Sequence, residues 1–284
     1  MILVKMEFQN RYRQAQSPKH DCLLFDLDDT LYPLSSGLAA ACRNNIEGYM
    51  VEKLGIDESK IPMMCNLLYK YYGTTMAGLR AIGYDFDHDD YHSYVHGRLP
   101  YEYLKPDLVL KNLLLSLPLR KVIFTNGDKI HAAKVLGRLG LADCFEGIIC
   151  FETLNPRQDP PPQEPLKTDI FEIIDYFSKL NASSEDLPKT PILCKPSEAA
   201  IEEALKIANI DPKRTIFFDD SLRNIQAGKR VGLHTVLVGT SQRLKGADFA
   251  LDSIHNIRQA LPELWEDEEK REGVRPAMET SVTA

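Results

Sequence analysis

The sequence predicts an α/β fold, a Rossmann-like parallel sheet with helices on both faces, together with an inserted all-helical domain. Several short, uniformly apolar runs each end in a polar residue, a pattern typical of strands buried on both faces of a parallel sheet. Stretches with helical periodicity lie between these runs, and such alternation indicates a doubly wound sheet. The expected strands are CLLF at 22–25, KVIF at 121–124, GIIC at 147–150, PILC at 191–194, TIFF at 215–218 and HTVLVG at 234–239.

The clearest helical pattern is SEAAIEEALKIANI, which starts at Ser197. Its apolar residues recur at the three- and four-residue spacing that places them on one face of a helix. Ser197 stands where a side chain can cap the first turn. We therefore expect a helix that packs one face against the sheet.

Residues 38–104 interrupt the alternation of strands and helices. They contain no good strand, several helical patterns and nine of the chain's 12 tyrosines. We interpret them as a helical domain inserted after the first strand. The predicted division is an N-terminal extension at 1–20, a core domain at 21–37 and 105–262, the insert at 38–104 and a flexible tail at 263–284.

A second interruption spans residues 155–190, where five prolines fall within 156–165. Proline cannot donate to a sheet ladder, so we expect a mobile surface loop here, followed by a helical FEIIDYF segment. A polyproline segment that binds a partner is the alternative, but the PxxP repeat typical of such ligands is missing.

Composition excludes several classes of protein. The 284 residues carry 34 Lys and Arg against 41 Asp and Glu, a net charge of −7, and 44% of them are hydrophobic. This is ordinary globular composition, without the basic surplus of a general nucleic-acid binder and without an apolar run long enough for a membrane helix. Six scattered cysteines lack a CxxC pair, and no secretory signal is evident at the N-terminus. We expect a cytoplasmic location, with the nucleus as an alternative.

Polar side chains follow four of the predicted strands. They are Asp26, Thr125, Lys195 and the pair Asp219–Asp220. Ligands of open α/β sheets bind in the crevice beyond the carboxyl ends of the strands, so these side chains should converge there. The sequence thus predicts an oxygen-rich site that includes one lysine.

The four motifs FDLDDT, FTNGD, CKPSEAA and FFDDS, in this order, resemble the signature motifs of the haloacid dehalogenase-like hydrolase superfamily. The helical insert resembles that superfamily's C1-type cap. Within the superfamily, the segment YHSYVHGRLPYEYLKPD is similar to the pyrimidine 5′-nucleotidase-like branch of fungi and plants, which includes xanthosine monophosphate phosphatases.

The resemblance implies catalytic roles for residues in the first three motifs. Asp26 would attack phosphorus and form an aspartyl-phosphate, and Asp28 would act as general acid and then general base. Thr125, with backbone N–H groups around Asn126, would bind the phosphoryl oxygens, and Lys195 would neutralise their charge. Asp29 has no assigned role, and we interpret it as a turn or helix-cap residue.

The resemblance also implies Mg²⁺ as cofactor. Its ligands would be Asp26, the backbone carbonyl of Asp28, Asp220 and, with less support from the family pattern, Asp219. Asn224 lies one helical turn after Asp220, and we expect it to orient that carboxylate.

Three histidines in the insert, His88, His92 and His96, recur at four-residue spacing. A zinc site on one helix face is conceivable, but no cysteine or carboxylate is obviously placed as a fourth ligand. The interpretation we prefer places His92, His96 and Arg98 at the boundary between insert and core, where they would bind the substrate's leaving group.

We therefore expect a Mg²⁺-dependent phosphomonoester hydrolase whose small-molecule substrate is a nucleoside 5′-monophosphate of pyrimidine or xanthosine type. The alternatives are a phosphatase of another small metabolite, such as a phosphosugar or pyridoxal phosphate, a phosphomutase, and a catalytically silent regulatory or binding protein with the same fold. No nucleic-acid or membrane partner is expected, and the sequence leaves the oligomeric state open.

Overall fold

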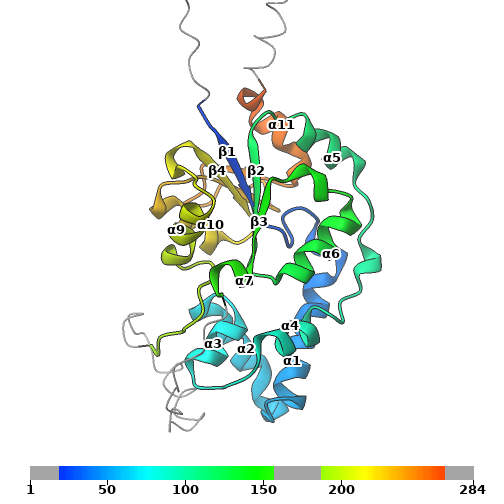
Figure 1. Cartoon of the computed structure of the whole chain (residues 1–284), viewed down its shortest axis with the longest axis vertical. Helices are drawn as coiled ribbons and strands as arrows, with labels where there is room; N and C mark the ends of the chain where they lie inside the picture. The colour runs from blue at the N-terminus through cyan, green and yellow to red at the C-terminus, as the bar shows by residue number, and fades with distance from the viewer. Residues whose placement is uncertain (1–18, 157–186, 266–284) are drawn as a thin grey trace, which may run out of the picture.

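A computed structural model describes residues 19–156 and 187–265 (Figure 1). Three expectations concern residues outside these ranges: most of the N-terminal extension, the body of the proline-rich loop with its FEIIDYF helix, and the tail from residue 266.

A six-stranded, all-parallel sheet in the order β3-β2-β1-β4-β5-β6 forms the centre of the molecule (Figure 1). The order reverses on either side of β1, as in doubly wound sheets. The predicted fold class is confirmed. The strands are β1 (Cys22–Phe25), β2 (Arg120–Phe124), β3 (Gly147–Ile149), β4 (Thr215–Asp219), β5 (His234–Val238) and β6 (Phe249–Leu251).

Helices cover both faces of this sheet (Figure 1). One apolar cluster packs α5, α6 and α11 against one face, and a second packs α7, α9 and α10 against the other. The α9 helix begins directly after Ser197 as predicted, although the Ser197 side chain makes no capping hydrogen bond. The helices are α5 (Leu108–Leu115), α6 (Lys129–Leu139), α7 (Phe151–Leu154), α9 (Glu198–Ile207), α10 (Leu222–Val231) and α11 (Ile257–Ala260).

Residues 191–194 are not a strand, which corrects one of our predictions. The backbone there joins no ladder. Two asparagine side chains instead bond the backbone of Leu193 and of Lys195, the residue directly after the segment. Asn155 accepts from the Leu193 N–H at 2.8 Å and donates to the Leu193 carbonyl at 2.9 Å. Asn126 holds Lys195 in the same way, at 2.9 and 3.0 Å. The backbone is thus satisfied without a strand partner.

Four helices form a separate group beyond the carboxyl ends of the strands (Figure 1). They share an apolar cluster of their own, built around Tyr49, Leu68 and Tyr91. This arrangement is what a core with an inserted helical domain would produce, and the exact division of the chain stays a prediction. The helices are α1 (Leu38–Glu52), α2 (Ile61–Tyr72), α3 (Thr75–Ala81) and α4 (His88–Val95).

Among the described residues, no helix has both the length and the apolar character that a membrane span requires.

Candidate active site

Strand register places the polar residues of three motifs at one edge of the sheet. Phe25 of β1 pairs with Ile123 of β2 and with Phe218 of β4. The residues that follow these positions therefore leave the sheet side by side, at its carboxyl edge. One cavity of about 280 Å³ is lined by residues from all four motifs, namely Asp26, Asp28, Thr125, Asn126, Lys195 and Asp220.

Asp26 is the buried carboxylate at the centre of this cavity. Its Oδ1 accepts from Lys195 Nζ at 2.6 Å and its Oδ2 accepts from Thr30 Oγ1 at 3.1 Å. Thr30 Oγ1 also accepts from the Asp220 backbone N–H at 3.1 Å, which ties the first motif to the fourth. Thr30, the last residue of FDLDDT, thus orients Asp26 toward the Asp220 segment.

Lys195 is fully buried, which is rare for a lysine, and three acceptors compensate its charge. Besides Asp26, its Nζ donates to Asp219 Oδ2 at 2.8 Å and to the Phe124 carbonyl at 2.7 Å. Burial alone would lower the pKa of Lys195, but the charges of Asp219 and Asp26 outweigh it and raise that pKa. The site therefore contains a fixed positive charge in contact with Asp26.

The FTNGD segment is held in a tight turn. Thr125 Oγ1 accepts from the Gly127 N–H at 2.9 Å, and a Cβ on Gly127 would lie 2.8 Å from the His131 ring. Glycine is required by this close approach. The Asn126 side chain is committed to the Lys195 backbone, so its part in ligand binding is restricted to its own main-chain N–H.

Asp219 and Asp220 differ in their surroundings. Asp219 is completely buried, and its carboxylate accepts from Lys195, from the Ser221 N–H at 2.8 Å and from Asn224 Nδ2 at 2.9 and 3.1 Å. Asn224 therefore orients Asp219 and not Asp220, contrary to our expectation, because the Asp219 side chain points toward the first turn of α10. Asp220 lines the cavity, and burial together with the Asp219 charge raises its pKa to about 7.

Asp28 belongs to a hydrogen-bonded group that the sequence did not reveal. Its Oδ1 accepts from Tyr32 OH at 2.5 Å and lies 2.7 Å from His131 Nε2. Burial raises the pKa of Asp28, but the His131 charge and these two hydrogen bonds outweigh it and lower that pKa to about 2. His131 has a raised pKa because the charge of Asp28 overcomes the opposite effect of burial. Together the two side chains form a hydrogen-bonded carboxylate–imidazole pair in which His131 is buried and Asp28 is partly exposed.

A sequence signal for His131 existed. It is the third residue of the helix that Asp128 caps, so its side chain lies in the first turn, at the end facing the crevice. Asp29 has a φ of 57° and a buried Oδ1 without a partner, which agrees with its interpretation as a turn residue.

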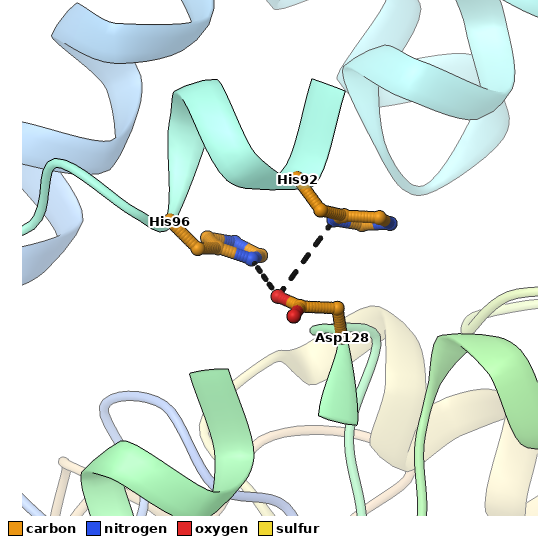
Figure 2. Close-up of side chains that lie close together, drawn as sticks. All are labelled: His92, His96 and Asp128. Carbon is orange, nitrogen blue, oxygen red and sulfur yellow. Dashed lines mark hydrogen bonds and ion pairs between the residues drawn. The ribbon is translucent and has the colours of Figure 1, made fainter. Parts of the chain in front are cut away.

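Two of the predicted cap histidines, His92 and His96, line the cavity. Both lie close to a carboxylate of the core, Asp128 (Figure 2). His96 Nδ1 lies 2.5 Å from Asp128 Oδ1, and His92 Nδ1 lies 3.9 Å from the same oxygen. His88 is not part of this cluster; its ring packs against Phe86 and Phe151.

Arg98, which we expected at the substrate, does not line the cavity. It is exposed, and its guanidinium stacks on the Tyr94 ring at 3.6 Å, while that ring packs against Tyr49 of α1. A different arginine, Arg43 of α1, lines a second cavity of about 360 Å³ that adjoins the first through Asp28 and His96. Arg43 Nη2 donates to Asn66 Oδ1 at 3.0 Å, and no motif in the sequence marked either residue.

The residues present fit a hard divalent cation. Carboxylate oxygens of Asp26, Asp219 and Asp220 lie within 4.8 Å of one another. Burial and the neighbouring Asp219 and Asp220 raise the pKa of Asp26, against the opposing effect of Lys195. A cation between these carboxylates would remove their repulsion and keep them ionised, and oxygen donors are those that Mg²⁺ prefers.

Residues 156–232 match a family model described as haloacid dehalogenase-like hydrolase. This range contains the third and fourth of the four motifs, CKPSEAA and FFDDS.

Two curated proteins and two solved structures are similar to the chain. Phosphate metabolism protein 8 of Saccharomyces cerevisiae is 31% identical over 139 residues, which span 46% of this chain and 43% of that protein. Phosphoglycolate phosphatase of Neisseria gonorrhoeae is 28% identical over 265 residues, 86% of this chain and 91% of that one. The magnesium-bound HAD hydrolase YfnB of Bacillus subtilis has a TM-score of 0.49 at 18% identity, covering 85% of this chain and 98% of its own. A HAD phosphatase of Thermococcus onnurineus has a TM-score of 0.47 at 18% identity, with 84% and 96% covered.

Proposed function

We propose that the protein is a Mg²⁺-dependent phosphomonoester hydrolase that acts through an aspartyl-phosphate intermediate, with a nucleoside 5′-monophosphate as substrate. The observation that carries the proposal is the setting of Asp26, a buried carboxylate held by Lys195 and Thr30 in a cavity that Thr125 and Asp220 also line. The phosphatase-named relative supports the reaction class. Six unpaired cysteines support a cytoplasmic location.

Asp26 is the proposed nucleophile. Its oxygens are oriented by Lys195 and Thr30, so the carboxylate is positioned for attack on phosphorus without rearrangement. Lys195, the Thr125 hydroxyl and the main-chain N–H of Asn126 would bind the phosphoryl oxygens. Preorganised donors of this kind stabilise the negative charge that develops in the transition state.

Asp28 is the proposed general acid and base, with His131 as its proton partner. The low pKa of Asp28 and the raised pKa of His131 favour a pair in which the imidazole holds the proton. That proton can move along the 2.7 Å contact to Asp28 and from there to the leaving oxygen. The water that attacks the phosphoenzyme would return a proton by the reverse route.

Asp26, Asp220 and the backbone carbonyl of Asp28 are the residues proposed to hold Mg²⁺. When bound, the ion would polarise the phosphoryl group and neutralise its charge. Asp219 is better suited to positioning Lys195, because hydrogen bonds within the protein already occupy both of its oxygens.

Chelation tests the reaction class and its metal dependence together. We expect phosphate release from p-nitrophenyl phosphate with Mg²⁺, a loss of at least about 100-fold in EDTA, and recovery when excess Mg²⁺ is added. The assay measures free phosphate. Absence of turnover with Mg²⁺ would favour the silent binding protein instead, and full activity in EDTA would remove the metal from the proposal.

The second cavity supports a nucleoside as leaving group. At about 360 Å³ it is within the usual range for small-molecule sites. The exposed surface of its lining is mostly apolar, and its polar groups include Arg43 and Asn66. Such a lining fits a flat base with a polar edge better than it fits a compact phosphosugar or phosphoglycolate. A phosphate-release screen across nucleoside monophosphates, sugar phosphates, pyridoxal phosphate and phosphoglycolate tests this choice.

We expect Arg43→Ala to lower kcat/KM for the preferred nucleotide by about tenfold, the effect of one lost hydrogen bond from a charged donor. Activity on p-nitrophenyl phosphate, which lacks the base and sugar, should change less than twofold. Arg138→Ala, an exposed arginine of α6 outside both cavities, is the matched control. Equal losses on both substrates would show that Arg43 does not contact the leaving group.

Asp28→Asn should slow hydrolysis of the nucleotide far more than that of p-nitrophenyl phosphate. Nitrophenolate is a good leaving group that needs little protonation, whereas a ribose alkoxide needs a proton. We expect a loss of 10²- to 10⁴-fold, the usual size of a general-acid effect, on the nucleotide. Steady-state kinetics with both substrates measure it, and a uniform loss would speak against proton transfer by Asp28.

A further inference from the structure

Three side chains from two parts of the chain converge on one point at the boundary between the helical insert and the core (Figure 2). His92 and His96 lie one helical turn apart at the end of α4, and Asp128 precedes α6. Their ligand atoms lie within 4.8 Å of one another. These are two imidazole nitrogens and a carboxylate oxygen, which is a donor set typical of zinc.

The state of His92 independently indicates a missing ligand. The residue is 93% buried, and neither ring nitrogen has a hydrogen-bond partner within the part of the chain that the structure describes. Buried polar atoms are normally satisfied, and each exception asks for an explanation such as an ion.

The two carboxylate oxygens of Asp128 have separate tasks. Oδ2 accepts from the Ile130 and His131 N–H groups at 3.1 and 3.3 Å and caps α6. Oδ1 faces the two histidines. The cap hydrogen bonds to Oδ2 therefore hold Asp128 in place with Oδ1 directed at the histidines. Carboxylates that bind metals are commonly fixed in this way by hydrogen bonds to surrounding groups.

The distances suit a small cation. A tetrahedral zinc with bonds of about 2.0–2.1 Å holds its ligand atoms about 3.3 Å apart. The Oδ1 of Asp128 lies 2.5 Å from His96 Nδ1 and 3.9 Å from His92 Nδ1, on either side of that value. A shift of Oδ1 away from His96 and toward His92, by less than about 1 Å, would equalise the two.

We propose that His92, His96 and Asp128 form a second metal site, selective for Zn²⁺ or a similar transition metal, that links the helical insert to the core. The site is separate from the Asp26–Asp219–Asp220 cluster, whose all-oxygen donors favour Mg²⁺. His92 and His96 line the cavity, so the fourth position of the ion would face the bound ligand or water. The proposal does not rest on the phosphatase assignment.

Metal content of the full-length protein tests the proposal. After EDTA treatment, the protein is dialysed against Zn²⁺, freed of excess ion and analysed by mass spectrometry for bound zinc. We expect Asp220→Asn to retain one zinc per chain. Substitution of a residue that only hydrogen-bonds to a metal ligand already lowers metal affinity about 10- to 100-fold. In the Asp220→Asn background, His92→Ala and Asp128→Asn change a ligand itself, so each should weaken zinc binding by more than about 100-fold.

His88→Ala, on the same helix but outside the cluster, is the matched control and should keep the zinc. Asp128→Asn also guards against misfolding, because asparagine caps helices as well as aspartate does. In the Asp220→Asn background, replacement of zinc by Co²⁺ should give the intense visible absorption of a tetrahedral site in the parent protein and in the His88→Ala control, but not in His92→Ala or Asp128→Asn. Zinc should likewise raise the melting temperature of the parent and the control and not that of the two cluster variants. Unchanged zinc content and cobalt spectrum in folded His92→Ala and Asp128→Asn would overturn the proposal.

Discussion

Asp26→Asn is expected to abolish turnover, with a loss of at least about a thousandfold in kcat on every phosphomonoester tested. The amide has the shape of the carboxylate but cannot attack phosphorus. Both contacts of Asp26 can persist, because Oδ1 still accepts from Lys195 and Thr30 Oγ1 can accept from the new amide. We expect a folded protein without activity, measured by phosphate release alongside circular dichroism.

Asp21→Asn is the matched control, since it makes the same change at the opposite end of β1. Asp21 is exposed and pairs with Arg214 far from the cavity, so activity should stay within about twofold. A second readout follows from the mechanism. The wild type, quenched in acid during turnover, should carry covalent phosphate, and Asp26→Asn should carry none. Retention of more than a thousandth of the parent rate would sink the role of Asp26 as nucleophile.

Local sequence predicted most of the sheet and the four motifs, because most strands are short apolar runs and each motif directly follows such a run. One predicted strand, at residues 191–194, is not a strand in the structure. Residues 191–194 resemble a strand, yet the backbone of Leu193 bonds to the side chain of Asn155, 38 positions away. The backbone of Lys195, directly after the segment, bonds to Asn126, 69 positions away. No pattern within the segment distinguishes an amide partner from a strand partner. Strand β6 was missed because its apolar run, Phe249–Leu251, is shorter than the runs of four or more residues by which the other strands were predicted.

The site was predictable only where one strand end determines a residue's place. Asp26, Thr125 and Asp220 meet through strand register alone. His131, Asp128 and Arg43 depend on how helices α6 and α1 pack. Arg98 lies in the turn after α4, so the helical spacing that places His92 and His96 does not fix the direction of its side chain. Four-residue spacing placed His92 and His96 on one face, but the carboxylate that joins them comes from a distant segment.

Lys195→Met is the second large effect that we expect, and it concerns stability as well as activity. The ammonium of Lys195 is buried between Asp26 and Asp219, at 2.6 and 2.8 Å. Methionine fills nearly the same volume but leaves two buried carboxylates facing each other without a counter-charge. Removing one partner of a buried ion pair typically costs about 3–5 kcal/mol in the free energy of unfolding. Urea denaturation at pH 7 in EDTA measures this quantity.

Lys206→Met on α9 is the matched control: the same substitution at an exposed lysine, where a change below about 0.5 kcal/mol is expected. If uncompensated charge is the cause, adding Asp219→Asn to Lys195→Met should restore part of the lost stability, so the two effects will not add. Turnover should stay low in the double variant, because the charge that faces the phosphoryl group is still missing. A loss below about 1 kcal/mol for Lys195→Met, or strict additivity with Asp219→Asn, would mean that Lys195 is held by packing and not by its two carboxylates.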